Sequence, residues 1–130
     1  MARFEKHVFV CVNERPPGHP RGCCFEKGST DIRTAFVKGL AQRGLKGVVR
    51  ANRSGCLDAC EMGPTVVIYP QGVWYLGVTP DDVDEIVDTS VIGDGIVERL
   101  VAKPEHWDRL RQIRAQRAGQ AEIATAKGNI

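Results

Sequence analysis

Hydrophobic and polar positions along the chain alternate in a way that predicts a small α/β protein. Short runs of β-branched and aromatic residues predict four buried strands, at 4–12, 47–52, 65–70 and 73–78. Prolyl and glycyl residues at 70–72 separate the last two runs, which is typical of a β-hairpin. Residues 96–101 predict a further short strand or a docking segment.

The first helix is predicted at residues 29–43, where apolar side chains recur every three or four positions. We expect Ser29, Thr30 or Asp31 to cap its start, because their side-chain oxygens can accept bonds from free backbone amides. Gly44 is a natural end, since glycine readily adopts the left-handed conformation that closes many helices.

A second helix is predicted at residues 79–91. Thr79 is its expected cap, and Pro80 occupies the first helical position, where a missing N–H does no harm. Acidic residues fill the first turn, where the helix dipole favours negative charge. The predicted apolar stripe consists of Val83, Ile86 and Val87.

The last part of the chain is basic and polar. Residues 101–130 carry 6 Lys and Arg against 3 Asp and Glu, whereas residues 1–100 carry 12 against 13. A polar helix is predicted from residue 104, with one face formed by Trp107, Leu110 and Ile113, and with disorder or a coreless helix beyond Arg117. We therefore divide the chain into a domain at 1–102 and a basic helical or disordered extension at 103–130. This charge predicts a solvated helix face and no nucleic-acid site, because no aromatic residues interleave with the basic ones.

Size and cysteine content narrow the class of protein. A chain of 130 residues with 42% hydrophobic residues is most simply one globular domain. Its longest apolar run, TVVIY, is far shorter than the roughly 20 residues that cross a bilayer, so no membrane partner is expected. The N-terminal segment is typical of a strand and not of a signal peptide, which predicts a cytoplasmic location. Five cysteines in such a compartment indicate metal or redox chemistry, because disulfides are rare there.

The cysteines lie at the ends of predicted strands, as Cys11, Cys23, Cys24, Cys56 and Cys60. A structural zinc site usually contains Cys-x2-Cys knuckles, and a thioredoxin-type dithiol needs Cys-x-x-Cys at a helix start. Neither motif occurs in this chain. An iron–sulfur cluster needs four thiolates on turns that can follow its surface, and the loop before Cys24 and the glycine-rich turn at Cys56 provide such turns. Spacing alone favours a cluster without identifying its type.

The segments FVCVNERPPGHPRGCC, SGCLDACEMGPTVVIYPQGVWY and DDVDEIV resemble the thioredoxin-like 2Fe-2S ferredoxins, a bacterial family of small electron carriers. The resemblance extends over about residues 4–101. It implies a thioredoxin-like α/β sandwich, with a central mixed sheet and two main helices, followed here by a polar C-terminal helical extension. It also implies one 2Fe-2S cluster per chain, with ligands Cys11, Cys24, Cys56 and Cys60.

Several expectations follow from that ligand set. Ligation by four cysteines predicts a low reduction potential, about −400 mV. Cys23 is not needed, and we expect Gly22, Gly55 and Gly63 to let the backbone approach the site closely. Asp58 and Glu61 flank the last ligands and are expected to be solvated loop charges, or else a docking point for a basic patch on a reductase.

The resemblance implies a non-enzymatic electron carrier that serves a protein donor and a protein acceptor and forms a homodimer. Of Trp74 and Tyr75, one should face the core and the other outward, where it is available to the dimer interface. The alternative function is a cluster-bearing binding or sensory module that docks a partner through the basic tail. For a simple carrier, deletion of residues 103–130 should leave the cluster and its potential intact.

Overall fold

The computed structural model describes residues 3–16, 18–19 and 21–128, with side chains as far as Gly119. Its strands are β1 (Lys6–Cys11), β2 (Val49–Ser54), β3 (Val66–Tyr69) and β4 (Val73–Tyr75). Its helices are α1 (Ser29–Gln42), α2 (Val83–Ile86) and α3 (Pro104–Gly128). Shorter helical turns are the 3₁₀ helices η1 (Cys60–Met62) and η2 (Pro80–Asp82) and the π-helix η3 (Val87–Ile92).

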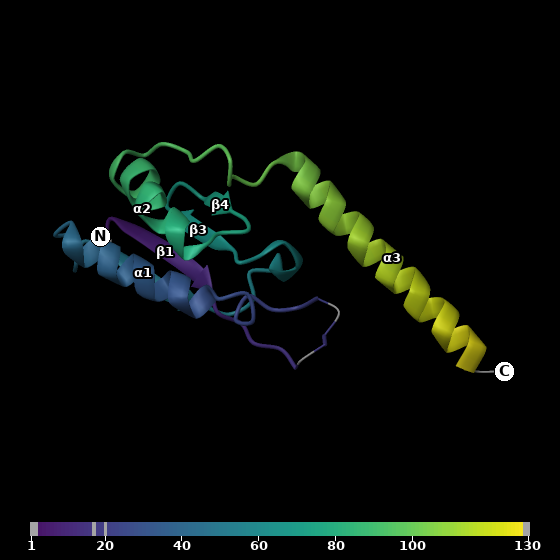
Figure 1. Cartoon of the computed structure of the whole chain (residues 1–130). Helices are drawn as coiled ribbons and strands as arrows, with labels where there is room; N and C mark the ends of the chain where they lie inside the picture. Colours follow the sequence, from purple (N-terminus) through teal and green to yellow (C-terminus); the bar gives the residue numbers. More distant parts are fainter. Residues whose placement is uncertain (1–2, 17, 20, 129–130) are drawn as a thin grey trace.

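The strands form one mixed sheet in the order β2-β1-β3-β4. Figure 1 labels β1, β3 and β4 of this sheet. β1 runs parallel to β2 and antiparallel to β3, and β3 and β4 form the expected hairpin. β2 begins and ends two residues later than the predicted 47–52, because Arg53 and Ser54 pair with the last residues of β1. Within 96–101, Val101 forms an isolated bridge with Tyr75, which is the docking contact expected of that segment.

One face of the sheet carries the hydrophobic core. Val8, Val10 and Ile68 are fully buried there, in one cluster with Phe36 of α1 and Ile86 of α2. α1 and the helical stretch from η2 to η3 also contact each other, so together they cover this face (Figure 1). The predicted stripe of the second helix is confirmed, since its members are all buried: Val83, Ile86 and Val87.

The two helix starts are capped in different ways. Thr79 and Asp82 form a capping box, in which the Thr79 N–H donates to Asp82 Oδ2 at 2.8 Å, so Thr79 is confirmed as a cap. The expected side-chain cap of α1 was wrong. Gly28 caps this helix at φ 89°, a left-handed conformation that suits glycine, and Ser29 is already inside the helix and fully buried.

α3 extends away from the sheet (Figure 1). Its first part is anchored to the domain, because Trp107 lies edge-to-face against Trp74, with ring centroids 5.6 Å apart, and Leu110 is buried. Its backbone is helical as far as Gly128. The predicted lack of a core beyond Arg117 concerns side chains that lie, after Gly119, outside the described residues. No helix in the described part of the chain has both the length and the apolar character needed to span a membrane.

Candidate metal centre

The cysteines come together because several connections meet at one edge of the sheet. Cys11 is the last residue of β1, and it pairs with Ser54 at the end of the parallel strand β2. The turn that follows Ser54 carries Cys56 and Cys60, and the loop that follows β1 carries Cys24 to the same edge. The parallel pairing of β1 and β2 therefore places distant parts of the sequence side by side.

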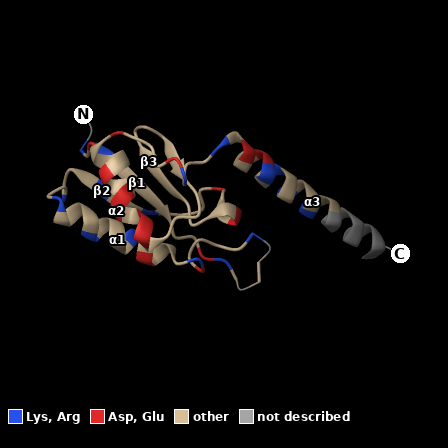
Figure 2. Cartoon of the chain, turned by 45° about the horizontal axis from the view of Figure 1, so that its top comes forward, with Lys and Arg blue, Asp and Glu red and all other residues tan. Residues whose placement is uncertain are grey.

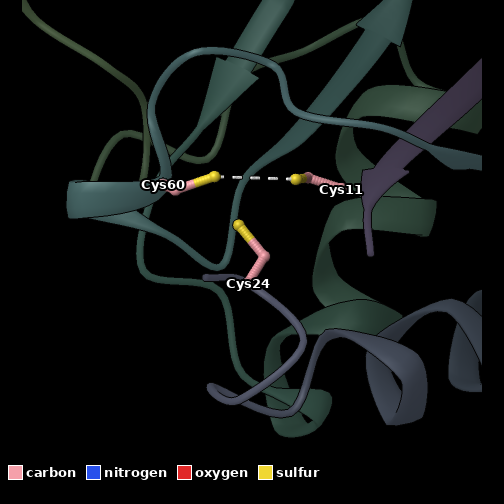
Figure 3. A group of neighbouring side chains, drawn as sticks. All are labelled: Cys11, Cys24 and Cys60. Atoms are coloured by element: carbon pink, nitrogen blue, oxygen red, sulfur yellow. Dashed lines mark hydrogen bonds between the residues drawn. The ribbon is translucent and has the colours of Figure 1, made fainter. Parts of the chain in front are cut away.

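Three sulfur atoms form a tight buried group. The Sγ atoms of Cys11, Cys24 and Cys60 all lie within 4.8 Å of one another, as Figure 3 shows. Cys56 adds a fourth sulfur, 3.6 Å from the Cys60 Sγ, and its side chain is exposed. The four cysteines singled out from the sequence thus form one connected group with a buried side and an exposed side.

The donor set is chemically uniform. The buried group contains thiols alone, and it contains Cys24 and not the adjacent Cys23, although both side chains are fully buried. Thiolates are soft ligands that suit iron–sulfur clusters and zinc. The donor set therefore fits an iron–sulfur cluster, and it also fits zinc.

Gly63 lies close to the Cys24 Sγ, where any other residue would be too large. A β-carbon on Gly63 would lie 2.6 Å from the Cys24 Sγ, closer than real side chains come, so the expected close approach is confirmed there. Gly22 adopts φ 64°, which glycine tolerates, whereas a β-carbon on Gly55 would meet nothing within 4 Å. The close approach is therefore shown for Gly63, and the expectations for Gly22 and Gly55 stay predictions about a bound cluster.

The thiols polarise one another. The Cys24 thiol beside Cys11 lowers the pKa of Cys11 to about 5, while Cys11 and burial together raise the pKa of Cys24. Burial also raises the pKa of Cys60. At Cys56 burial acts in the same sense, but bonds from the Asp58 amide and the Arg15 guanidinium outweigh it and lower the pKa. The group thus favours thiolate at Cys11 and Cys56.

Two arginines in the loop between Cys11 and Cys24 contact the exposed side of the site. Arg15 donates to the Cys56 Sγ at 3.1 Å and to the Gly22 carbonyl at 2.8 Å. Arg21 lies 4.0 Å from the same sulfur and bonds Asp58 at 2.9 Å. Neither arginine was predicted from the sequence, although both lie in the loop that joins two predicted ligands, where cations would be close to the thiolates.

Asp58 and Glu61 differ in their surroundings, because the Asp58 side chain is 74% exposed whereas Glu61 is buried among arginines. The Glu61 side chain is only 5% exposed, and it bonds the guanidinium groups of Arg21, Arg114 and Arg117. Burial opposes ionisation of Glu61, but the bonds from Arg114 and Arg117 outweigh it and lower its pKa to about 2. The expectation of a solvated charge was therefore wrong for Glu61, because α3 brings two basic residues against the cysteine turn (basic positions are blue and acidic positions red in Figure 2). Asp58 is solvated as expected, and its role in docking stays a prediction.

Backbone geometry also supports this turn. Asp58 adopts φ 64°, and its amide donates to the Cys56 Sγ at 3.2 Å. Lys27 donates through Nζ to the Cys60 carbonyl at 2.7 Å, which ties the turn to the loop before α1. Amide and cationic donors around thiolates stabilise negative charge on sulfur.

Comparisons with known proteins agree with this geometry. No family model matches the chain. It is 51% identical over 104 residues to a 2Fe-2S ferredoxin of Aquifex aeolicus, a match that covers 78% of this chain and 91% of that protein. A 2Fe-2S ferredoxin of Clostridium pasteurianum is 42% identical over 100 residues, covering 77% and 98% of the two chains. The crystal structure of the thioredoxin-like [2Fe-2S] ferredoxin from A. aeolicus superposes with a TM-score of 0.72 at 50% identity, covering 78% of this chain and 99% of that one.

Proposed function

The chain belongs to the thioredoxin-like [2Fe-2S] ferredoxins, and we propose that it holds one 2Fe-2S cluster with which it carries single electrons between redox proteins. The proposed ligands are Cys11, Cys24, Cys56 and Cys60. The observation that carries this proposal is the connected group of four cysteine sulfurs at one edge of the sheet. Four thiolates are the number that a 2Fe-2S cluster takes.

The chain's own residues give such a site an inner and an outer side. A bound cluster supplies a reversible one-electron couple, and its negative charge grows by one on reduction. Cys11, Cys24 and Cys60 are buried, so they keep water from the inner side. Cys56 is exposed, so a partner comes closest to the site there. Arg15 and Arg21 offset negative charge at this sulfur.

Composition of the purified protein tests the proposal directly. We expect a red-brown protein with about two irons and two acid-labile sulfides per chain, and an electron paramagnetic resonance signal after reduction. A colourless protein that contains a single zinc would contradict it and would identify a structural zinc domain instead.

The partners and assembly are part of the same proposal. We propose a cytoplasmic, non-enzymatic carrier that meets a protein donor and a protein acceptor and forms a homodimer, as members of its family are expected to do. Tyr75 is fully buried and Trp74 is half-buried against Trp107 of its own chain, so Trp74 is the aromatic residue that faces outward. Sedimentation equilibrium tests the dimer, and a monomer at all concentrations would contradict it.

The second candidate function is a module that docks a partner through the basic tail. The observation that bears on it is the engagement of Arg114 and Arg117 with Asp58 and Glu61, which uses part of the tail's charge within the chain. This engagement favours the carrier. Transfer rates to a redox partner that fall steeply with Arg109→Ala, an exposed tail position, would favour the docking module instead.

A further inference from the structure

A single arginine of α3 holds both acidic residues of the cysteine turn. Arg114 donates through Nη2 to the Asp58 carbonyl at 2.8 Å and through Nη1 to the Asp58 carboxylate at 3.2 Å. Its Nε and Nη2 also donate to the two carboxylate oxygens of Glu61, at 2.9 and 3.3 Å. The planar guanidinium therefore bonds Asp58 and Glu61 at the same time. A lysine lacks the planar array of N–H groups that makes this possible.

Arg114 also holds the residue whose amide bonds the exposed thiol. Asp58 sits in a left-handed conformation, and its amide points to the Cys56 Sγ at 3.2 Å. Arg114 grips the same residue by its carbonyl and its carboxylate. The contact from α3 thus reaches Cys56 through one residue, and it reaches Cys60 through the adjoining Glu61.

Apolar contacts bring that arginine to the turn. Trp107, Leu110, Arg114 and Arg117 recur every three or four positions, so they share one face of α3. Trp107 packs on Trp74 and Leu110 is buried, and both lie toward the start of the helix. Arg117 then adds a second guanidinium, whose Nη2 donates to Glu61 at 2.6 Å.

We propose that α3 is part of the redox centre, and that Arg114 is a positioning residue that raises the reduction potential by holding its positive charge against the carboxylates of Asp58 and Glu61, next to Cys56 and Cys60. This inference rests on the proposed cluster. A fixed cation near the thiolates stabilises the added electron, and its removal leaves Asp58 and Glu61 with one guanidinium fewer to balance their charge. We therefore expect deletion of residues 103–130 to lower the reduction potential, whereas the sequence alone led us to expect no change.

The test compares two arginines of the same helix in the full-length protein. Arg111 is 71% exposed and pairs with Asp108 on α3 itself, so Arg111→Ala removes the same charge without touching the cysteine turn. We expect Arg114→Ala to lower the equilibrium constant for reduction about threefold to tenfold, a tenfold change being about 59 mV for one electron. Arg111→Ala should change it by less than about twofold. Equal potentials in the two variants, with normal visible spectra, would overturn the inference.

Two further measurements test the inference if Arg114→Ala does not assemble a cluster. If Arg114→Ala assembles no cluster, Arg117→Ala takes its place, because it removes only one bond to Glu61. A decrease in the reduction potential, smaller than that expected for Arg114→Ala, supports the inference. An unchanged potential overturns it. Amide hydrogen exchange of residues 104–117 gives a readout that needs no iron. Glu61→Gln should accelerate this exchange, and unchanged exchange would overturn the anchoring of α3 even if the chain proved to bind no cluster.

Discussion

Gly63 and Cys24 stand so close that a single methyl group at residue 63 would lie 2.6 Å from the Cys24 sulfur. The two residues come from different loops, and their approach places the sulfur against the backbone that precedes β3. The next contacts of such a methyl group are the amide and hydroxyl of Thr65, at 3.3 and 3.4 Å, so it has no space into which to move.

Gly63→Ala should therefore displace Cys24 and lower the amount of cluster per chain at least about fivefold, since overpacking a dense site typically costs 1–3 kcal/mol. Iron and sulfide content and the visible absorption per protein measure the loss. Gly119→Ala on α3 is the matched control, because its β-carbon meets nothing within 4 Å. Equal cluster content in the two variants would contradict this view of the site.

Serine substitutions separate the ligands from the extra thiol. Replacement of Cys11, Cys24 or Cys60 should abolish a normal visible spectrum, because each removes a thiolate from the buried sulfur group. Cys56→Ser should leave a weaker, altered spectrum, since its hydroxyl stays at the exposed edge as a poorer ligand.

Cys23→Ser is the internal control of this series and should keep the unaltered spectrum. Cys23 is buried next to Cys24 but does not belong to the three-sulfur group. If Cys23→Ser lost the cluster while Cys24→Ser kept it, the assignment of the second ligand would be reversed.

Local patterns in the sequence predicted much of the fold, because strands and helices carry their own periodicity. The hairpin after Tyr69 and the helix cap at Thr79 depend on residues close in sequence, and both predictions are confirmed. The first residue of α1 was predicted correctly but its cap was not, because Gly28 caps the helix by its backbone conformation and no side-chain oxygen is needed.

The surroundings of the site were harder to predict than its cysteines. The contact from Arg114 to Glu61 joins residues 53 positions apart, and the contact from Arg15 to Cys56 joins residues 41 apart. Such pairs depend on the paths of α3 and of the loop before Cys24, and no local spacing specifies those paths. The cysteines were recognised because their spacing matches that of a known family.

Acid stability should depend on Asp82, which is buried at the start of the second helical stretch. Burial raises its pKa, but bonds from Thr79 and Arg99 outweigh this and hold the pKa below its usual range. A carboxylate with a lowered folded pKa stabilises the fold above its unfolded pKa of about 3.9, and this stabilisation is lost as the pH falls through the folded value.

Asp82→Asn should accordingly lower the free energy of unfolding at pH 7 by about 1 kcal/mol, as is typical for a lost capping interaction. The difference from the unmodified chain should stay constant from about pH 8 to pH 5 and shrink below about pH 4. Urea midpoints followed by circular dichroism across this range provide the measurement. Asp81→Asn, at the exposed neighbouring position, should change the midpoint much less, and a difference that grows toward acid pH would contradict the assignment.

Arg15, which bonds the exposed thiol directly, should affect the reduction potential at least as much as Arg114 of α3. Arg15 donates straight to the Cys56 Sγ at 3.1 Å, whereas Arg114 reaches that sulfur only through Asp58. Arg15→Gln should therefore lower the equilibrium constant for reduction about tenfold, or about 59 mV, at low salt. Arg53→Gln, an exposed position of β2, is the control and should leave the potential unchanged. A potential for Arg15→Gln that matches this control, in a protein with a normal spectrum, would show that the Arg15 contact does not tune the potential.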